Sequence, residues 1–193
     1  MKYVLFLLLF IAAMLAVFFS FSATYMACAD AETRVRHARV QLVQEVMNLA
    51  QLLPSVAALY YRFGTNGPYI VTYAEQARTQ LEQQHSPLGM ARAHAALQSA
   101  LQSMAAEISA HPRARSHLKY RDVMTALNDT TQRIAYLQLQ YNSAVADFNQ
   151  LLASPQPAFW RSMMGMTNAE PFLAPTSATS ASPTHQRQPR AAR

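Results

Sequence analysis

Glycine and cysteine are both scarce in this chain of 193 residues, which has four glycines and one cysteine, Cys28. A single cysteine excludes an internal disulfide, and the sequence has neither a glycine-rich phosphate loop nor the glycines of a nucleophile elbow. Scarce glycine beside abundant Ala, Gln, Leu and Met favours helix, because glycine costs backbone entropy and unbranched side chains keep their rotamers. No stretch alternates like a strand, so we expect an all-α chain.

Charged residues are absent between Lys2 and Asp30, and the run from Tyr3 to Phe19 is almost purely aliphatic and aromatic. A helix needs roughly 20 apolar residues to cross ~30 Å of hydrocarbon, which predicts a transmembrane anchor over residues 1–29. The alternative is a cleaved signal and a periplasmic or secreted helical protein, because Ala27-Cys28-Ala29 fits a cleavage site. The run is longer than the roughly 7–15 apolar residues of a signal.

Positive charge exceeds negative charge, with a formal net charge of +6. The basic residues are scattered rather than arranged as a stripe with aromatics, so no nucleic-acid binding is expected. One lysine precedes the apolar run and three arginines follow it, at Arg34, Arg36 and Arg39. The excess of positive charge places the region after the anchor in the cytoplasm.

Apolar residues at steps of three and four predict about four long helices within residues 30–154. The first continues from the anchor to Phe63, with a kink at Pro54. Gly64 to Pro68 has turn chemistry, the second helix runs from Tyr69 to Gln84, and the third ends before His111-Pro112. Together these helices predict an antiparallel bundle.

The fourth helix has the clearest pattern, with Ser116 as its N-cap and Ser154-Pro155 as its end. Its apolar seam continues over about five heptads, which is typical of coiled-coil-like packing. The seam positions are Tyr120, Val123, Leu127, Thr130, Ile134, Leu137, Tyr141, Ala144, Phe148 and Leu151.

After this helix the composition changes twice. Residues 155–173 form an apolar C-terminal segment whose Phe159, Trp160, Met163 and Met164 suit a membrane interface, a partner groove or a cap on the bundle. Residues 174–193 are rich in Thr, Ser, Ala, Pro and Arg, which cannot bury enough apolar surface to offset ordering entropy. They predict a disordered basic tail.

No set of residues predicts catalysis, a cofactor or a metal. Glu82 and His85 have the spacing of bundle di-iron ligands, but a second copy is missing, so a bundle metalloprotein is only a remote alternative. The candidate site is instead Tyr141, Asn142, Asp147, Phe148 and Asn149 on the fourth helix. Asn142 and Asn149 are one heptad apart and share a face, with Asp147 off that line. They either dock a partner or fix helix register.

Several stretches resemble the LemA family. Arg133-Ile134-Ala135-Tyr136, followed by Tyr141 to Asn149 (YNSAVADFN), is similar to that family's C-terminal signature, and Leu52 to Val56 (LLPSV) is similar to its "LIPNLV". The chain departs from the family at Arg39, where a tryptophan is usual, and at Asn48 and Leu49, where basic residues are usual. The family's ending is matched only faintly, at Pro155, Gly165, Glu170 and Phe172.

The resemblance implies a single-pass protein of the bacterial inner (cytoplasmic) membrane with an antiparallel bundle in the cytoplasm. No enzymatic activity is established for LemA proteins. The expected partners are therefore the lipid bilayer and an unidentified protein, in an interaction or scaffold role.

Overall fold

The computed structural model describes residues 2–64, 67–153 and 167–173, and every regular element in these ranges is a helix. The residues expected at the membrane interface or partner groove, from Phe159 to Met164, lie outside the described residues, as does the tail 174–193. The helices are α1 (Lys2–Phe63), α2 (Tyr69–Gln83), α3 (Pro87–Ala110), α4 (Pro112–Arg115) and α5 (Leu118–Ala153). The all-α prediction is confirmed.

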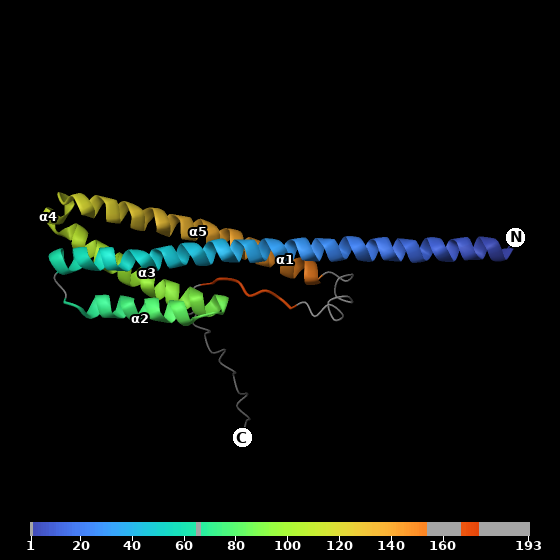
Figure 1. The fold of residues 1–193 in the computed structure, drawn as a ribbon, viewed down its shortest axis with the longest axis horizontal. Coiled ribbons are helices and arrows are strands. Elements are labelled where there is room, and N and C mark those ends of the chain that lie inside the picture. Colours follow the sequence, from blue (N-terminus) through green and yellow to red (C-terminus); the bar gives the residue numbers. More distant parts are fainter. Residues whose placement is uncertain (1, 65–66, 154–166, 174–193) are drawn as a thin grey trace, which may run out of the picture.

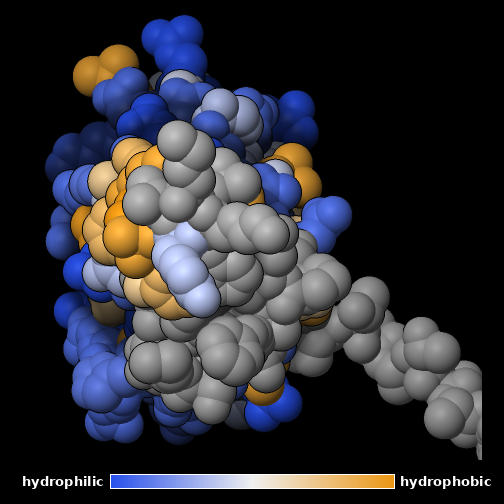
Figure 2. Space-filling view, turned by 90° about the vertical axis from the view of Figure 1, so that its right-hand side faces the viewer, coloured by the Kyte–Doolittle hydropathy of each residue, from blue (hydrophilic) through white to orange (hydrophobic). Residues whose placement is uncertain are grey.

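The first helix is a single rod of 62 residues that continues through Pro54 without interruption. Figure 1 shows that its N-terminal part projects alone beyond the other helices, while its C-terminal part lies among them. A view from the N-terminal end shows apolar side chains gathered in front of the largely hydrophilic surface of the bundle (Figure 2). The long apolar helix preceding a packed bundle is therefore as expected. The kink at Pro54 stays a prediction.

The bundle is antiparallel: in Figure 1, α1 and α3 run from right to left, and α2 and α5 run from left to right. The two long helices, α1 and α5, lie side by side, and α3 packs against both α1 and α2. Every predicted seam residue of α5 is buried or partly buried, including Leu127, Ile134, Tyr141 and Phe148. The core is continuous from Leu42 on α1 through α2 and α3 to α5. Burial of these faces supplies most of the helix stability.

The predicted helix ends agree with the structure except near Ser116. At the first turn Gly67 adopts φ 73°, which suits glycine because it lacks a Cβ. Ser86 caps α3 by accepting a hydrogen bond from the Gly89 N–H at 3.1 Å. Ser116 was expected to cap α5, but its hydroxyl donates to the Arg113 carbonyl at 3.0 Å and it ends the short α4. The N-cap prediction is wrong because a short extra turn, α4, lies between α3 and α5 and ends at Ser116.

Polar contacts made by Glu45 and Arg39 are among those that connect α1 to other elements. The carboxylate of the buried Glu45 accepts a hydrogen bond from Asn48 at 3.0 Å and lies 3.6 Å from Nε of Arg133, which belongs to the "RIAY" stretch on α5. Arg39 donates to the carbonyl of His85 at 2.7 Å and so holds the end of α2. A buried carboxylate requires such partners.

Candidate functional site

The polar residues singled out on α5 lie where the chain returns to the bundle after that helix. Residues 167–173, which we call the strap, have no regular secondary structure and run along α5. In Figure 1 the strap is the red segment beside the orange end of α5. Most of its side chains are exposed, but Phe172 is buried and Ala169 is partly buried.

Asn142 and Asn149 each bind one residue of the strap through both of its main-chain groups. Asn142 accepts a hydrogen bond from the Phe172 N–H at 2.8 Å and donates to the Phe172 carbonyl at 3.1 Å. Asn149 accepts from the Ala169 N–H at 2.9 Å and donates to the Ala169 carbonyl at 2.9 Å. A carboxamide suits this task because it carries an acceptor and a donor side by side.

The spacing of the two asparagines matches the spacing of the two strap residues. Seven helical residues rise about 10.5 Å along α5. Three residues of extended chain span about 10 Å. The same heptad spacing that puts Asn142 and Asn149 on one helix face therefore puts Ala169 and Phe172 opposite them, with the strap antiparallel to α5.

Tyr141 adds a third contact between α5 and the strap. Its hydroxyl donates to the Glu170 carbonyl at 2.8 Å, between the two asparagine pairs. Burial raises the pKa of Tyr141, the Glu170 carboxylate adds to this rise, and Arg39 opposes it. A raised pKa keeps the phenol protonated, which the donor role requires.

Phe172 is the residue that joins the strap to the core. Its side chain is 4% exposed and its ring centroid lies 6.2 Å from that of His94 on α3. Burial lowers the pKa of His94 to about 4, so the imidazole is neutral at pH 7. His94 Nε2 is buried and has no hydrogen-bond partner in the described part of the chain. His94 is thus a core histidine.

The remaining candidates on α5 take different places. Phe148 is buried in a small cluster with Cys28, Ala31 and Leu152, and Ala169 of the strap packs against it. Asp147 is exposed and lines an open groove on the side of α1 and α5 that also includes Arg34. The structure therefore brings Tyr141, Asn142, Phe148 and Asn149 together around the strap and leaves Asp147 outside it.

Sequence reasoning found the asparagine pair but missed what it binds. The two hypotheses were that the asparagines dock a partner or that they fix helix register. Neither predicted that they bind the strap of the same chain. The available signal was Phe172, a large apolar residue at the end of the apolar segment.

Metal ligation has no support in residues 2–64, 67–153 and 167–173, which hold no group of three His, Cys, Asp or Glu side chains close enough to bind an ion. Glu82, which has di-iron spacing to His85, pairs with Arg78 at 3.0 Å on the exposed face of α2. These residues form an ordinary helix ion pair.

We call Asn142 and Asn149, with their hydrogen bonds to the strap, the asparagine clamp. The fold and this clamp define a class: an all-α protein with a long apolar N-terminal helix, a four-helix core and a C-terminal strap held by side chains of α5. The sequence model of the LemA family matches residues 50–186. The chain belongs to the LemA family. No curated protein matches it significantly.

Proposed function

We propose that this LemA family protein is a single-pass membrane protein whose cytoplasmic bundle binds a protein partner and does not catalyse a reaction. The observation that carries the proposal is the uncovered N-terminal part of α1. The large apolar side chains that the structure describes there are each at least 46% exposed, which is unfavourable in water and favourable in hydrocarbon. They are Leu7, Leu8, Leu9, Phe10, Ile11, Met14, Leu15, Phe18, Phe19 and Met26.

The length of this part of α1 supports a membrane span. Residues 3–27 of an α-helix rise about 38 Å, enough to cross ~30 Å of hydrocarbon. Hydropathy and length also allow the later stretch Tyr25–Phe63 as a span. However, half of its apolar 18-residue segment is buried inside the bundle, as in the core helix of a soluble domain. The exposed part before it is the better candidate for the anchor.

Burial around Cys28 favours a retained anchor over a cleaved signal. Cys28 is fully buried in a cluster with Ala31, Phe148 and Leu152, so it packs on the last turns of α5. Cleavage after Ala29 would remove Cys28 from this cluster and leave Phe148 partly uncovered. The arginines that follow the anchor, against the single lysine before it, support a bundle in the cytoplasm and hence an inner-membrane location in a bacterium.

Alkaline carbonate extraction of membranes tests the anchor. The wild-type chain is expected to stay in the membrane pellet, while Ile11→Arg with Leu15→Arg shifts it to the supernatant, because each arginine at the centre of a span costs about 2.5–3.5 kcal/mol. Leu139→Arg, at an exposed position of α5, is the matched control and should stay in the pellet. Wild-type protein in the supernatant, or a mature chain that begins at Asp30, would reject the anchor.

Photocrosslinking in cells tests the interaction role. A photoreactive residue at exposed positions of the bundle, such as Tyr136 and Leu139, should give a discrete crosslinked species that mass spectrometry identifies. Positions Asn142 and Asn149 are poor choices because the strap occupies them. Crosslinks that spread over abundant proteins without a reproducible partner would contradict an interaction role.

A further inference from the structure

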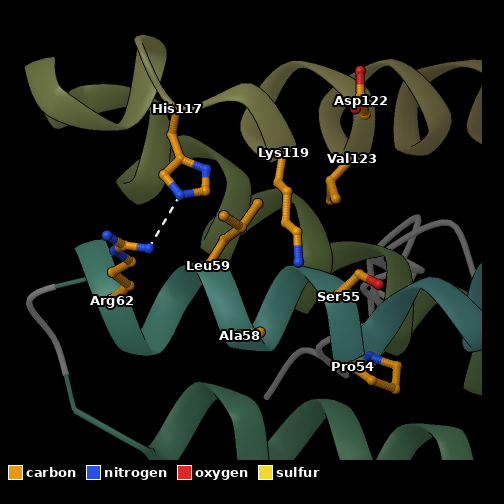
Figure 3. Close-up of a pocket in the computed structure, with 9 residues that line it drawn as sticks. All are labelled: Pro54, Ser55, Ala58, Leu59, Arg62, His117, Lys119, Asp122 and Val123. Atoms are coloured by element: carbon orange, nitrogen blue, oxygen red, sulfur yellow. Dashed lines mark hydrogen bonds between the residues drawn. The ribbon is translucent and has the colours of Figure 1, made fainter.

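A cavity of about 520 Å³ lies at the end of the bundle remote from the start of α1. It is formed by the last turns of α1, the first two turns of α5 and His117 just before them. Figure 3 shows Arg62 rising from α1 and Lys119 descending from α5, with His117 above Arg62. Leu59 and Val123 line the same cavity with apolar surface, and Ser55 adds a hydroxyl. The volume is within the range of ligand sites, about 300–1,000 Å³.

The Arg62 guanidinium is held in place before any ligand arrives. It stands 5.6 Å from the centroid of the Phe63 ring and lies 3.1 Å from Nε2 of His117. A guanidinium only donates, so Nε2 must accept, and the neutral ring then carries its proton on Nδ1. Nδ1 of His117 is buried and has no partner in the described part of the chain. The Arg62 guanidinium is therefore fixed at the cavity wall by Phe63 and His117.

Positive charge around this cavity is mostly uncompensated. The stretch from His111 to Arg121 contains four Lys or Arg residues and no Asp or Glu. Asp122 is the one carboxylate among the residues lining the cavity. Neither Lys119 nor Asp122 makes an ion pair within the described residues. The cavity thus has a surplus of positive groups and suits an anion with a short apolar stem.

The anchoring bilayer cannot supply that anion. Residues 30–62 of α1 rise about 50 Å, which places the cavity far beyond the Debye length of about 8 Å at physiological salt. Two exposed apolar or aromatic residues adjoin the lining residues in the chain, Tyr61 at 66% and Leu118 at 75% exposed. Tyrosine and arginine are the residues most enriched at energetically important contact points.

We propose that this cavity binds a glutamate side chain from an acidic segment of a soluble partner protein. Arg62 and Lys119 hold the carboxylate, and Leu59 and Val123 pack against its methylene groups. The inference rests on the interaction role proposed above and identifies both the surface used and the charge of the partner.

The test uses purified full-length protein in detergent and a fluorescein-labelled decapeptide of glutamate, followed by fluorescence anisotropy at fixed salt. Wild-type protein should bind the peptide saturably. Arg62→Gln with Lys119→Gln should weaken binding about tenfold, because a positioned charge pair in a cavity contributes more than an exposed one. The matched control is Arg34→Gln with Arg92→Gln, which removes the same charge from exposed sites elsewhere and should change binding less than twofold.

A second variant tests the cavity without changing charge. Ala58 is an exposed residue that lines it, so Ala58→Trp should fill the space and weaken glutamate binding while circular dichroism stays unchanged. Equal weakening in both double variants, or unchanged binding in Ala58→Trp, would overturn the proposal. Tighter binding of a single-stranded oligonucleotide than of the peptide would overturn it in favour of nucleic acid. Because the protein is already solubilised, none of these outcomes affects the carbonate test of the anchor.

Discussion

Replacing Asn142 or Asn149 by alanine should release the strap while leaving the bundle folded. Each asparagine makes two hydrogen bonds to the strap backbone. A net contribution of about 0.5–1.5 kcal/mol per bond gives roughly 1–3 kcal/mol for each residue. Alanine recovers up to about 0.7 kcal/mol through its higher helix propensity. The expected net loss is therefore about 1–2 kcal/mol per site.

Hydrogen exchange of the Ala169 and Phe172 amides measures this loss directly, because each amide donates to one asparagine. A loss of about 1–2 kcal/mol corresponds to exchange roughly 5–30-fold faster. The effect should be confined to the strap, since amides in α1 and α3 exchange through wider opening of the bundle. Asn142→Asp keeps the acceptor but sets a second oxygen against the Phe172 carbonyl, so it should be at least as damaging as alanine.

Asn128 provides the matched control, because it lies on the same helix, is exposed and makes no side-chain hydrogen bond within the described chain. Asn128→Ala should leave exchange of the strap amides unchanged and raise the stability of α5 slightly. If Asn142→Ala and Asn149→Ala behave like Asn128→Ala, the clamp contributes nothing and the reasoning above is refuted.

Three further predictions concern the core and a helix cap. The free energy of unfolding should fall by up to about 3 kcal/mol as pH decreases from 6.5 to about 4, because His94 binds a proton in the unfolded chain but stays neutral when buried. Chemical denaturation at several pH values should show this dependence in wild type and in His85→Gln, and a weaker one in His94→Leu. Phe172→Ala should speed hydrogen exchange of the Ala169 amide, and it should lower the free energy of unfolding by less than the usual 3–5 kcal/mol because the strap can detach. Phe172→Leu should lower it less, and equal amide protection in the Ala and Leu variants would contradict this. Ser86→Ala should cost about 1 kcal/mol in thermal unfolding through loss of the cap on Gly89, and an unchanged midpoint would show that the cap is not used.

The regular part of the fold was readable from the sequence because its signal is periodic. The seam from Tyr120 to Leu151 and the prolines at helix starts locate α5, α3 and their ends. Local hydrophobic spacing is sufficient there, since each helix must bury one face. The extra turn of α4 has no such periodicity and was not predicted. Ser116 was therefore assigned to the start of α5, although it ends α4.

The strap could not be predicted for a different reason. Asn142 and Asn149 bind main-chain atoms, which every residue has, so the strap sequence carries almost no record of the contact. Only Phe172 must be a particular kind of residue, because its side chain enters the core. The burial of Val145 and Leu152, which lie off the predicted seam, was missed along with it.

The position of the strap follows from a difference in helix length. The 36 residues of α5 are 12 more than the 24 of α3, a difference of about 18 Å. The seven residues of the strap span about 23 Å when extended, so they can cover the part of α5 that α3 does not reach. Phe172 meets α3 at His94, and Ala169 packs farther along, beside Phe148 and Leu152.

A chain that ends at residue 166 should therefore expose Val145, Phe148 and Leu152 and bind more of an apolar fluorescent dye than wild type. Removing only residues 174–193 is the matched control, since it leaves the strap and should leave dye binding unchanged. Asn142→Ala with Asn149→Ala should give an intermediate increase, because the strap remains tethered and Phe172 still favours docking. Equal dye binding by both truncated chains would mean that the strap covers nothing that α1 and α5 do not already bury between them.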